Sequence, residues 1–141
     1  MLSYIMGHTK PDIAYALNVL SRYCNNPGRR HVEFLLCLVK YCEYSKDDRL
    51  KFHAHPGPYD AKTMRSLARF QCDADLAGNL DNSHSTSAHI GYIGHSVVSF
   101  TSKTLGSLST STAESEIKAV NQCLNEEALA LREMLNLMGF L

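Results

Sequence analysis

The sequence predicts a mixed α+β fold in which a helical hairpin precedes three antiparallel strands and a long helix. Three observations lead to this prediction. Apolar residues recur at helical spacing over residues 11–44, three short β-rich runs lie between residues 67 and 101, and a capping pattern opens a helical stretch at Ser111. The chain has 141 residues, of which 45% are hydrophobic and 20% are charged, so it can bury a core.

The first segment, residues 1–45, is expected to form the helical hairpin. Pro11 suits the first turn of a helix over Pro11–Tyr23, and the Asn25–Gly28 stretch ends that helix. The second helix is expected from about Arg30 to Tyr44. Its apolar side consists of Phe34, Leu35, Leu38, Val39 and Cys42.

The second segment, residues 46–66, is interpreted as a linker with room for a short strand at Leu50–Phe52. It combines the charged run Lys46-Asp-Asp-Arg with the Pro56-Gly-Pro-Tyr run, and both interrupt regular periodicity. The third segment, residues 67–141, holds the sheet. Its expected strands are Leu67–Asp73, Ala88–Ile93 and Val97–Thr101, with a turn at Ala77–Ser83 and a tight hairpin at Gly94-His-Ser.

The last expected element is a helix that begins at Ser111. Ser111 and Glu114 have the spacing of a capping box, in which each side chain satisfies a backbone amide of the first turn. Six apolar residues beyond this cap fall on one stripe, which is the expected apolar side of the helix: Ile117, Val120, Leu124, Leu131, Leu135 and Met138.

Charge is unevenly distributed although the formal net charge is zero. Residues 1–69 hold 11 Lys/Arg against 6 Asp/Glu, whereas residues 70–141 hold 3 against 8. Two interpretations stay open: chance segregation of surface charge, or a basic half that faces a polyanion and an acidic half that holds metal.

Five cysteines without a C-x-x-C pair favour reduced thiols and a reducing compartment. No signal-peptide pattern and no apolar run of about 20 residues is present, so neither secretion nor a membrane is expected.

Carboxylates stand where a strand ends and where a helix begins. Asp73 ends the first expected strand, and Glu114 and Glu116 lie in the first turns of the last helix. Hydrolysis of a phosphodiester by two metal ions needs several carboxylates on one side, and Mg²⁺ prefers such oxygen ligands. The alternative is structural: Asp73 caps the turn, and the glutamates complement the helix dipole.

Four motifs in this order resemble the ribonuclease H region of Pol polyproteins from copia-type LTR retrotransposons. The family patterns S-D-A-D-W-A-G, S-T-S-G, W-x-S-K and S-S-T-E-A-E-Y-x-A-L correspond to Cys72–Gly78, Ser85–Ala88, Phe100–Lys103 and Thr110–Val120. Four upstream stretches resemble the end of the reverse transcriptase region of the same polyprotein: Thr9–Tyr15, Leu20–Tyr23, Asn26–Gly28 and His31.

This resemblance implies a partial ribonuclease H-like fold for residues 67–141 and a helical tail of the reverse transcriptase, of the thumb or connection type, for residues 1–45. Asp73 and Glu116 align with catalytic, metal-binding carboxylates of the family. Three further residues match family positions, with Asp75 and Glu114 as additional candidate metal ligands and Lys103 as a weaker candidate for contact with nucleic-acid phosphate.

The resemblance also implies a cofactor and partners. Mg²⁺, with Mn²⁺ as a substitute, would be the cofactor of an active domain. The partners would be an RNA–DNA hybrid and the rest of the Pol polyprotein. The expected location is a cytoplasmic virus-like particle, the nucleus, or both.

The sequence departs from the family pattern in two ways. Family tryptophans are replaced by Val32, Leu76, Phe100 and Ala130. No aspartate follows Asp81, so the third and fourth acidic ligands of the family have no counterpart. We therefore expect this chain to be inactive as a nuclease by itself, with an unpaired sheet edge that favours self-association. The alternative function is that of a repurposed, non-enzymatic interaction protein, such as a pathogen effector acting on host proteins, although no R-x-L-R motif is present.

Overall fold

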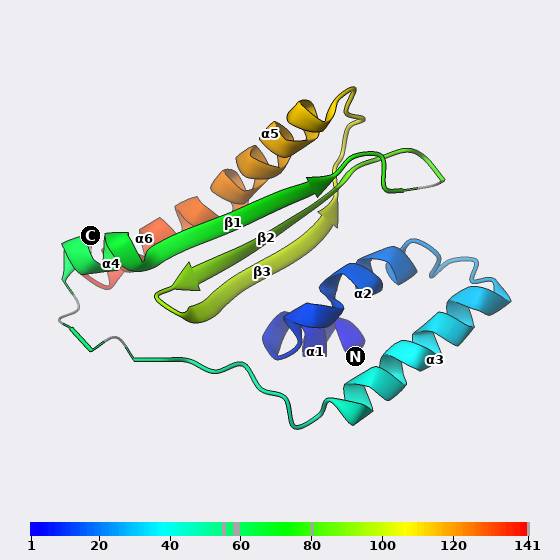
Figure 1. Cartoon of the computed structure of the whole chain (residues 1–141), viewed down its shortest axis with the longest axis horizontal. Coiled ribbons are helices and arrows are strands. Elements are labelled where there is room, and N and C mark those ends of the chain that lie inside the picture. Colours follow the sequence, from blue (N-terminus) through cyan, green and yellow to red (C-terminus); the bar gives the residue numbers. More distant parts are fainter. Residues whose placement is uncertain (55, 58–59, 80, 141) are drawn as a thin grey trace. The chain divides into compact units, whose positions relative to one another are not determined.

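The computed structural model describes residues 1–54, 56–57, 60–79 and 81–140, and these form two compact units, residues 1–50 and 51–141. His55, Pro58 and Tyr59 of the expected linker and Leu80 of the expected turn lie outside the described residues. The mixed α+β class is confirmed, with helices in both units and an open antiparallel sheet of three strands in the second (Figure 1).

The first unit consists of helices only. They are α1 (Leu2–His8), the 3-10 turn η1 (Pro11–Ile13), α2 (Ala14–Ser21) and α3 (Arg29–Tyr44). The second hairpin helix begins one residue before the expected Arg30. The first is shorter than expected because η1 takes its first turn, where Pro11 stands, and α2 ends at Ser21. Helix α1 was not predicted.

Side-chain contacts at the helix ends hold the hairpin together. The Gly28 amide donates to His31 Nδ1 at 3.0 Å, which caps α3, and the His31 ring stacks on Tyr23 with centroids 3.8 Å apart. At the other end of α3, the buried Lys10 ammonium donates to the carbonyl of Ser45. A cation at a helix C-terminus stabilises the unpaired carbonyls there.

The second unit begins with α4 (Ala61–Leu67) and continues with β1 (Ala68–Asp75), β2 (Thr86–Ile93) and β3 (Ser96–Thr104). Part of the expected linker is therefore helical, because the Asp60 carboxylate caps α4 by accepting from the Thr63 amide at 2.7 Å. Leu67 ends this helix instead of opening a strand. No strand forms at Leu50–Phe52, where the described backbone is irregular.

The three strands pair in the order β1-β2-β3, antiparallel throughout, with Asp73 opposite Ala88 and Phe70 opposite Gly91. Each expected strand is present, and the Gly94 hairpin has the positive φ, +61°, that glycine adopts readily. Within the described residues β1 and β3 each pair along one side only. Association through a sheet edge stays a prediction.

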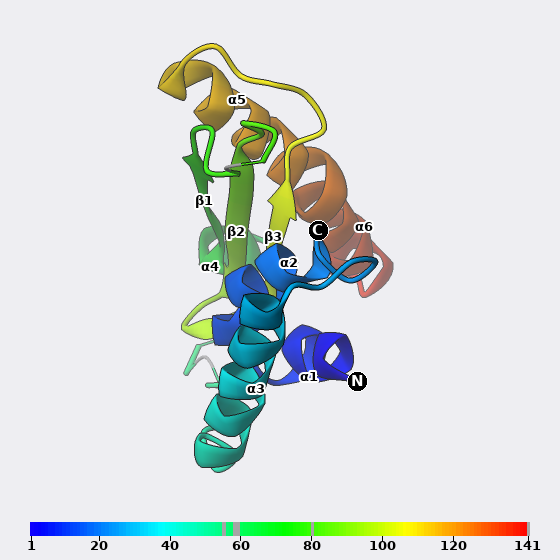
Figure 2. The ribbon, with the colours of Figure 1, turned by 90° about the vertical axis from the view of Figure 1, so that its right-hand side faces the viewer.

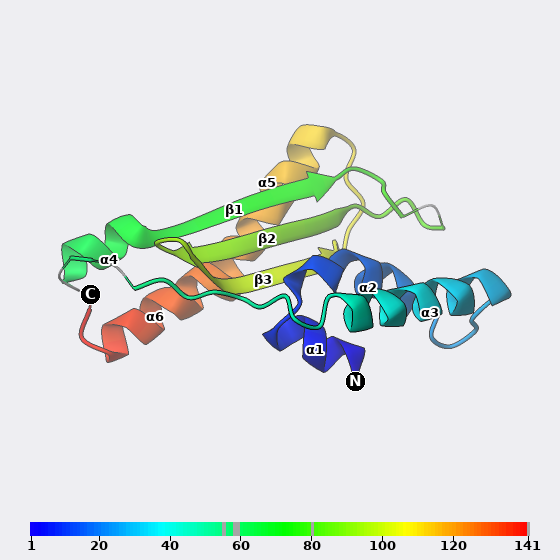
Figure 3. The same ribbon diagram turned by 60° about the horizontal axis from the view of Figure 1, so that its bottom comes forward.

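One face of the sheet is covered by a continuous helical run of α5 (Thr112–Cys123), the π-helical turn η2 (Leu124–Ala128) and α6 (Leu129–Leu137). Figure 2 shows this run along one side of the strands, and Figure 3 shows the strands crossing in front of it. Within the described residues, none of the helices is both long enough and apolar enough to cross a membrane.

The buried side of the helical run differs from the expected stripe. Ile117, Val120 and Leu124 are 70%, 46% and 51% exposed, and of the expected six only Leu135, at 2%, is fully buried. The residues that face the sheet in α5 are small: Ser115, Ala119 and Cys123, each at most 1% exposed. Small side chains let a helix approach a sheet closely, so packing density favours this face over the more apolar one.

Candidate functional site

Asp73 lies on the face of β1 that points away from α5. Exposure alternates along this strand, so that Arg69, Gln71, Asp73 and Asp75 are exposed while Phe70, Cys72 and Ala74 are half-buried. Cys72 contacts Cys123 of α5, which assigns the even-numbered residues to the covered face. Asp73 is thus a strand residue on the uncovered face, and it does not cap the turn.

Glu116 lies in the second turn of α5, on the flank of the buried face. The cap that starts this helix is present as predicted, since Ser111 Oγ accepts from the Glu114 amide at 3.2 Å. Glu116 follows the fully buried Ser115 and precedes the exposed Ile117, and its own side chain is half-buried. The helix therefore presents Glu116 at the edge of the side that packs on the sheet.

Asp75 lies beside Gly78, in the turn that follows β1. A Cβ atom at Gly78 would lie 1.8 Å from Asp75 Oδ2, so the carboxylate occupies the space that only glycine leaves open. Backbone hydrogen bonds close the same turn, from the Asn79 amide to the His84 carbonyl at 3.0 Å and from the Ser83 amide to the Asn79 carbonyl at 2.7 Å. The Asp75 carboxylate therefore lies against this turn.

Glu114 is engaged at the start of α5. Its carboxylate lies 2.7 Å from Lys118 Nζ and accepts hydrogen bonds from the amide and hydroxyl of Thr110 at 2.8 and 2.7 Å. The hydrogen bond from Lys118, followed by those from Thr110, lowers the pKa of Glu114 to about 2. The carboxylate is thus ionised and held in place as a helix-capping group.

Lys103 is also paired. Its ammonium lies 2.6 Å from Glu126 Oε2 in η2, and Glu126 accepts a second hydrogen bond from Gln122 at 3.1 Å. The Lys103 hydrogen bond is the largest cause that lowers the pKa of Glu126. Both side chains are partly exposed, at 51% and 39%, so solvent screens this pair.

The candidate carboxylates do not assemble into a metal site. Within the part of the chain that the structure describes, no three His, Cys, Asp or Glu side chains approach closely enough to hold a metal ion. Of the four, Glu114 is already engaged by Lys118 and Thr110. The catalytic and metal-binding roles of the four acids, with Mg²⁺ or Mn²⁺ as cofactor, therefore stay predictions.

A polar cluster between the sheet and the helical run was not found from the sequence. His89 is 2% exposed, its Nε2 lies 3.6 Å from Glu127 Oε1, and Glu127 Oε2 accepts from Ser99 Oγ at 2.7 Å. Cys72 is the strand partner of His89 and contacts Cys123. The period-two alternation of β2, which puts Ser87, His89 and Gly91 on one face, was the signal that could have indicated it.

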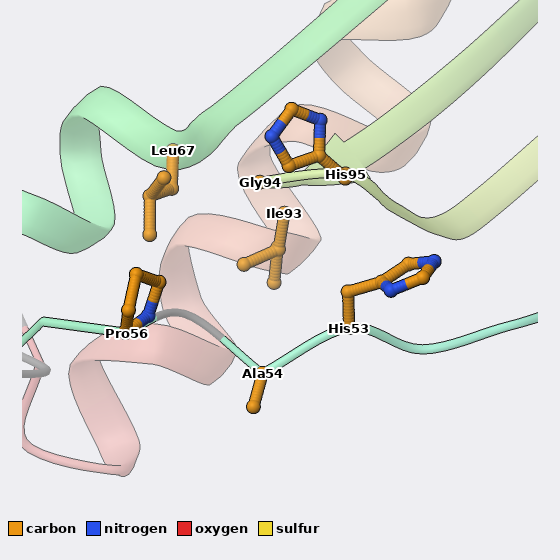
Figure 4. Close-up of a pocket in the computed structure, with 7 residues that line it drawn as sticks. All are labelled: His53, Ala54, Pro56, Leu67, Ile93, Gly94 and His95. Atoms are coloured by element: carbon orange, nitrogen blue, oxygen red, sulfur yellow. The ribbon is translucent and has the colours of Figure 1, made fainter.

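The second unit also has a pocket of about 280 Å³ at the end of the β2–β3 hairpin. Figure 4 shows Pro56, Leu67 and Ile93 lining it, with His53 and His95 contributed by two separate segments. The His53 amide donates to Ser96 Oγ at 2.8 Å, which holds the 51–54 stretch at this end of the sheet. None of the candidate carboxylates lines this pocket, so it is separate from the predicted site.

An open antiparallel sheet covered on one face by a capped helix is consistent with part of a ribonuclease H-like fold. The comparisons with known proteins show what the chain is similar to. The chain is 31% identical over 138 residues to the retrovirus-related Pol polyprotein from transposon TNT 1-94 of Nicotiana tabacum, a match that covers 98% of this chain and 10% of the polyprotein. It is 29% identical over 129 residues to the corresponding polyprotein from transposon RE1 of Arabidopsis thaliana, over 86% of this chain and 8% of the relative.

These matches confirm the resemblance seen in the motifs: the chain is related to a segment of copia-type retrotransposon Pol polyproteins. It spans about a tenth of the length of these relatives. A third relative is similar in length, the secreted RxLR effector protein 161 of Plasmopara viticola, at 28% identity over 125 residues, 89% of this chain and 82% of the effector. No protein-family model and no solved structure matches the chain.

Proposed function

We propose that this chain corresponds to the junction in a Pol polyprotein where the reverse transcriptase region ends and a ribonuclease H-like domain begins. The reaction of that domain would be hydrolysis of RNA in RNA–DNA hybrids. One observation carries the proposal: the match to the tobacco polyprotein runs along 138 residues and so includes both structural units. The motif order around Asp73 and Glu116 supports the assignment of the second unit.

In this proposal the 141 residues are inactive as a nuclease by themselves. Asp73 and Glu116 would contribute to catalysis only with further carboxylates from outside this chain, because the described residues do not bring three ligands together. Mg²⁺ or Mn²⁺ would then be held jointly, at a site that this chain completes only in part.

The experiment is a cleavage assay on a labelled RNA–DNA hybrid with Mg²⁺ and with Mn²⁺. We expect no cleavage by the purified chain. A chimera that continues after Leu141 with the stretch following the matched segment in the tobacco polyprotein should cleave. Asp73→Asn and Glu116→Gln should each abolish that cleavage, whereas Glu133→Gln, an exposed acid of α6, should retain it.

Two outcomes would contradict the proposal. Cleavage by the unmodified chain, lost in Asp73→Asn and Glu116→Gln, would overturn its inactivity, whereas a folded but inactive chimera would overturn the nuclease assignment. Circular dichroism of each variant separates loss of activity from loss of fold.

The proposal also predicts weak, sequence-independent binding to the hybrid. Residues 1–69 carry 11 Lys/Arg against 6 Asp/Glu, and basic surfaces bind nucleic-acid phosphates with an affinity that falls as salt rises. A cytoplasmic or nuclear location would accompany this role.

A second candidate function is that of a non-enzymatic interaction protein acting on host proteins. The observation that favours it is the match over 82% of the length of the Plasmopara viticola effector, whereas the polyproteins are about ten times longer than the matched segment. Binding to an RNA–DNA hybrid that weakens steeply between 50 and about 200 mM salt would favour the first function. Saturable binding to one host protein, with no affinity for the hybrid, would favour the second.

A further inference from the structure

Two cysteines face each other between the sheet and its covering helix. Cys72 lies on the covered face of β1, half-buried, and Cys123 ends α5 with 1% of its surface exposed. The Cys72 thiol lies close enough to Cys123 to raise the pKa of the Cys123 thiol. Neither is in a disulfide.

The strand register and the helix geometry place these thiols at the same level of the sheet. Cys72 is the strand partner of His89, and His89 Nε2 lies 3.6 Å from Glu127 Oε1. Glu127 follows Cys123 by four residues, about one turn further along the helical run, in the π-helical turn η2. Cys123 therefore lies above the Cys72–His89 pair.

The packing around them is close because the facing residues are small. The buried side of α5 consists of Ser115, Ala119 and Cys123, and Ser87 Oγ of β2 donates to Gln122 Oε1 at 2.6 Å across the same interface. A disulfide needs the Cα atoms of its two cysteines to lie within about 7 Å of each other. Small inner residues let a helix approach a sheet closely, which favours such a separation. Larger residues at positions 115 and 119 would hold the two thiols apart.

The surroundings favour thiol chemistry over metal binding. Although His89 and Glu127 lie nearby, no three of the described His, Cys, Asp and Glu side chains converge on a metal position. Burial, followed by the neighbouring Cys72 thiol and the charge of Glu127, raises the pKa of the Cys123 thiol to about 12. Cys123 is thus protonated at neutral pH, and the more exposed Cys72 is the thiol that an oxidant reaches first.

We propose that Cys72 and Cys123 form a reversible disulfide that fastens helix α5 to strand β1 when the chain meets a small disulfide oxidant such as glutathione disulfide. The Cys72 thiolate attacks one sulfur of the oxidant and releases one glutathione as its thiol. Cys123 then loses its proton and attacks the Cys72 sulfur, which releases the second glutathione. Two protein thiols are oxidised, one disulfide is reduced to two thiols, and the two protons end on the glutathiones.

The consequence is a chain that exists in two covalent forms. In a compartment rich in reduced glutathione the pair stays as thiols, and in an oxidising one it closes. The bond joins the two elements that carry the candidate acids, since Asp73 follows Cys72 and Glu116 lies two turns before Cys123 on α5.

The test uses the full chain with Cys24, Cys37 and Cys42 changed to Ser, so that only the proposed pair remains. The folded protein is incubated with glutathione disulfide, its free thiols are trapped with N-ethylmaleimide, and the intact mass is measured. We expect the number of labelled thiols to fall from two to zero with the loss of two hydrogens, and dithiothreitol to restore both. The closed form should unfold about 10 °C or more above the open form, because the bond constrains the unfolded chain.

Cys123→Ser in the same background is the matched control. It should stop at a mixed disulfide between glutathione and Cys72, which would identify Cys72 as the first thiol to react. The proposal is overturned if the folded two-cysteine chain keeps both thiols or stops at the mixed disulfide. It is equally overturned if the bond forms only after unfolding in urea, since the thiols would then not be neighbours in the native state. Circular dichroism of the two-cysteine chain confirms that the test is made on the folded protein.

Discussion

Gly91→Ala should destabilise the second unit because a Cβ atom there collides with an aromatic ring. Gly91 lies opposite Phe70 on the covered face of the sheet, and a Cβ at Gly91 would lie 2.6 Å from Phe70 Cε1 and 3.1 Å from Cδ1. Carbon atoms pack at about 3.5–4.0 Å, so the overlap is about 1 Å, and overpacking of this kind costs about 1–3 kcal/mol. In the absence of a clash, alanine would instead stabilise a strand by about 0.5–1 kcal/mol. The sign of the change in the free energy of unfolding therefore shows whether the clash with Phe70 occurs.

The assay is a urea titration in which the buried Cys123 thiol is labelled, because its exposure reports unfolding of this unit alone. Gly106→Ala is the matched control, since a Cβ at Gly106 would meet nothing within 4 Å, and its midpoint should stay close to that of the parent. Phe70→Leu should relieve the clash, so that Gly91→Ala costs at least about 1 kcal/mol less in that background. A Gly91→Ala protein as stable as the parent would refute the close approach of the ring.

Three further predictions concern the charged and polar groups near α5. Ser111→Ala should lower the free energy of unfolding by about 1 kcal/mol, measured by the same titration, because the Glu114 amide loses its cap. The pKa of Glu114 is lowered from its ordinary value of 4.5 to about 2. The ionised carboxylate therefore contributes its full share of folding stability above pH 4.5, and this contribution is lost as the pH falls from 4.5 to about 2. Lys118→Met should move that pKa upward in an NMR titration of the carboxyl carbon, and an unchanged value would show that the ion pair is absent in solution. Lys103→Met should likewise raise the pKa of Glu126, which Lys103 holds below its usual range.

Local sequence rules predicted elements whose signals lie within a few residues. The cap at Ser111, the hairpin at Gly94 and the three strands depend on side chains that act on their own backbone, and each of them is present. The alternation along β1 likewise places Asp73 on one face and Cys72 on the other.

The sequence did not predict which face of α5 packs on the sheet, nor which residues distant in sequence are in contact. Ile117, Val120 and Leu124 form the more apolar stripe of α5 and the start of η2, yet Ser115, Ala119 and Cys123 face the sheet. Periodicity measures the difference between two sides of a helix, but close packing depends on the volume of the sheet residues opposite. The contact between Cys72 and Cys123, 51 positions apart in the printed sequence, depends on this choice and was missed for the same reason.

The π-helical turn η2 determines how the deletion of one residue would affect the helices on either side of it. Successive residues of an α-helix are about 100° apart, so the twelve steps from Cys123 to Leu135 would leave them about 120° apart in a regular helix. Both are nevertheless buried, at 1% and 2%, because the wide turn at Leu124–Ala128 takes up one extra residue and reduces that angle to about 20°. Loss of one residue, such as the exposed Asn125, would turn this stretch into an ordinary α-helix and leave both ends in phase. The same loss within α5 would rotate everything after it away from the sheet, so relatives can differ by one residue at this turn without a shift in register.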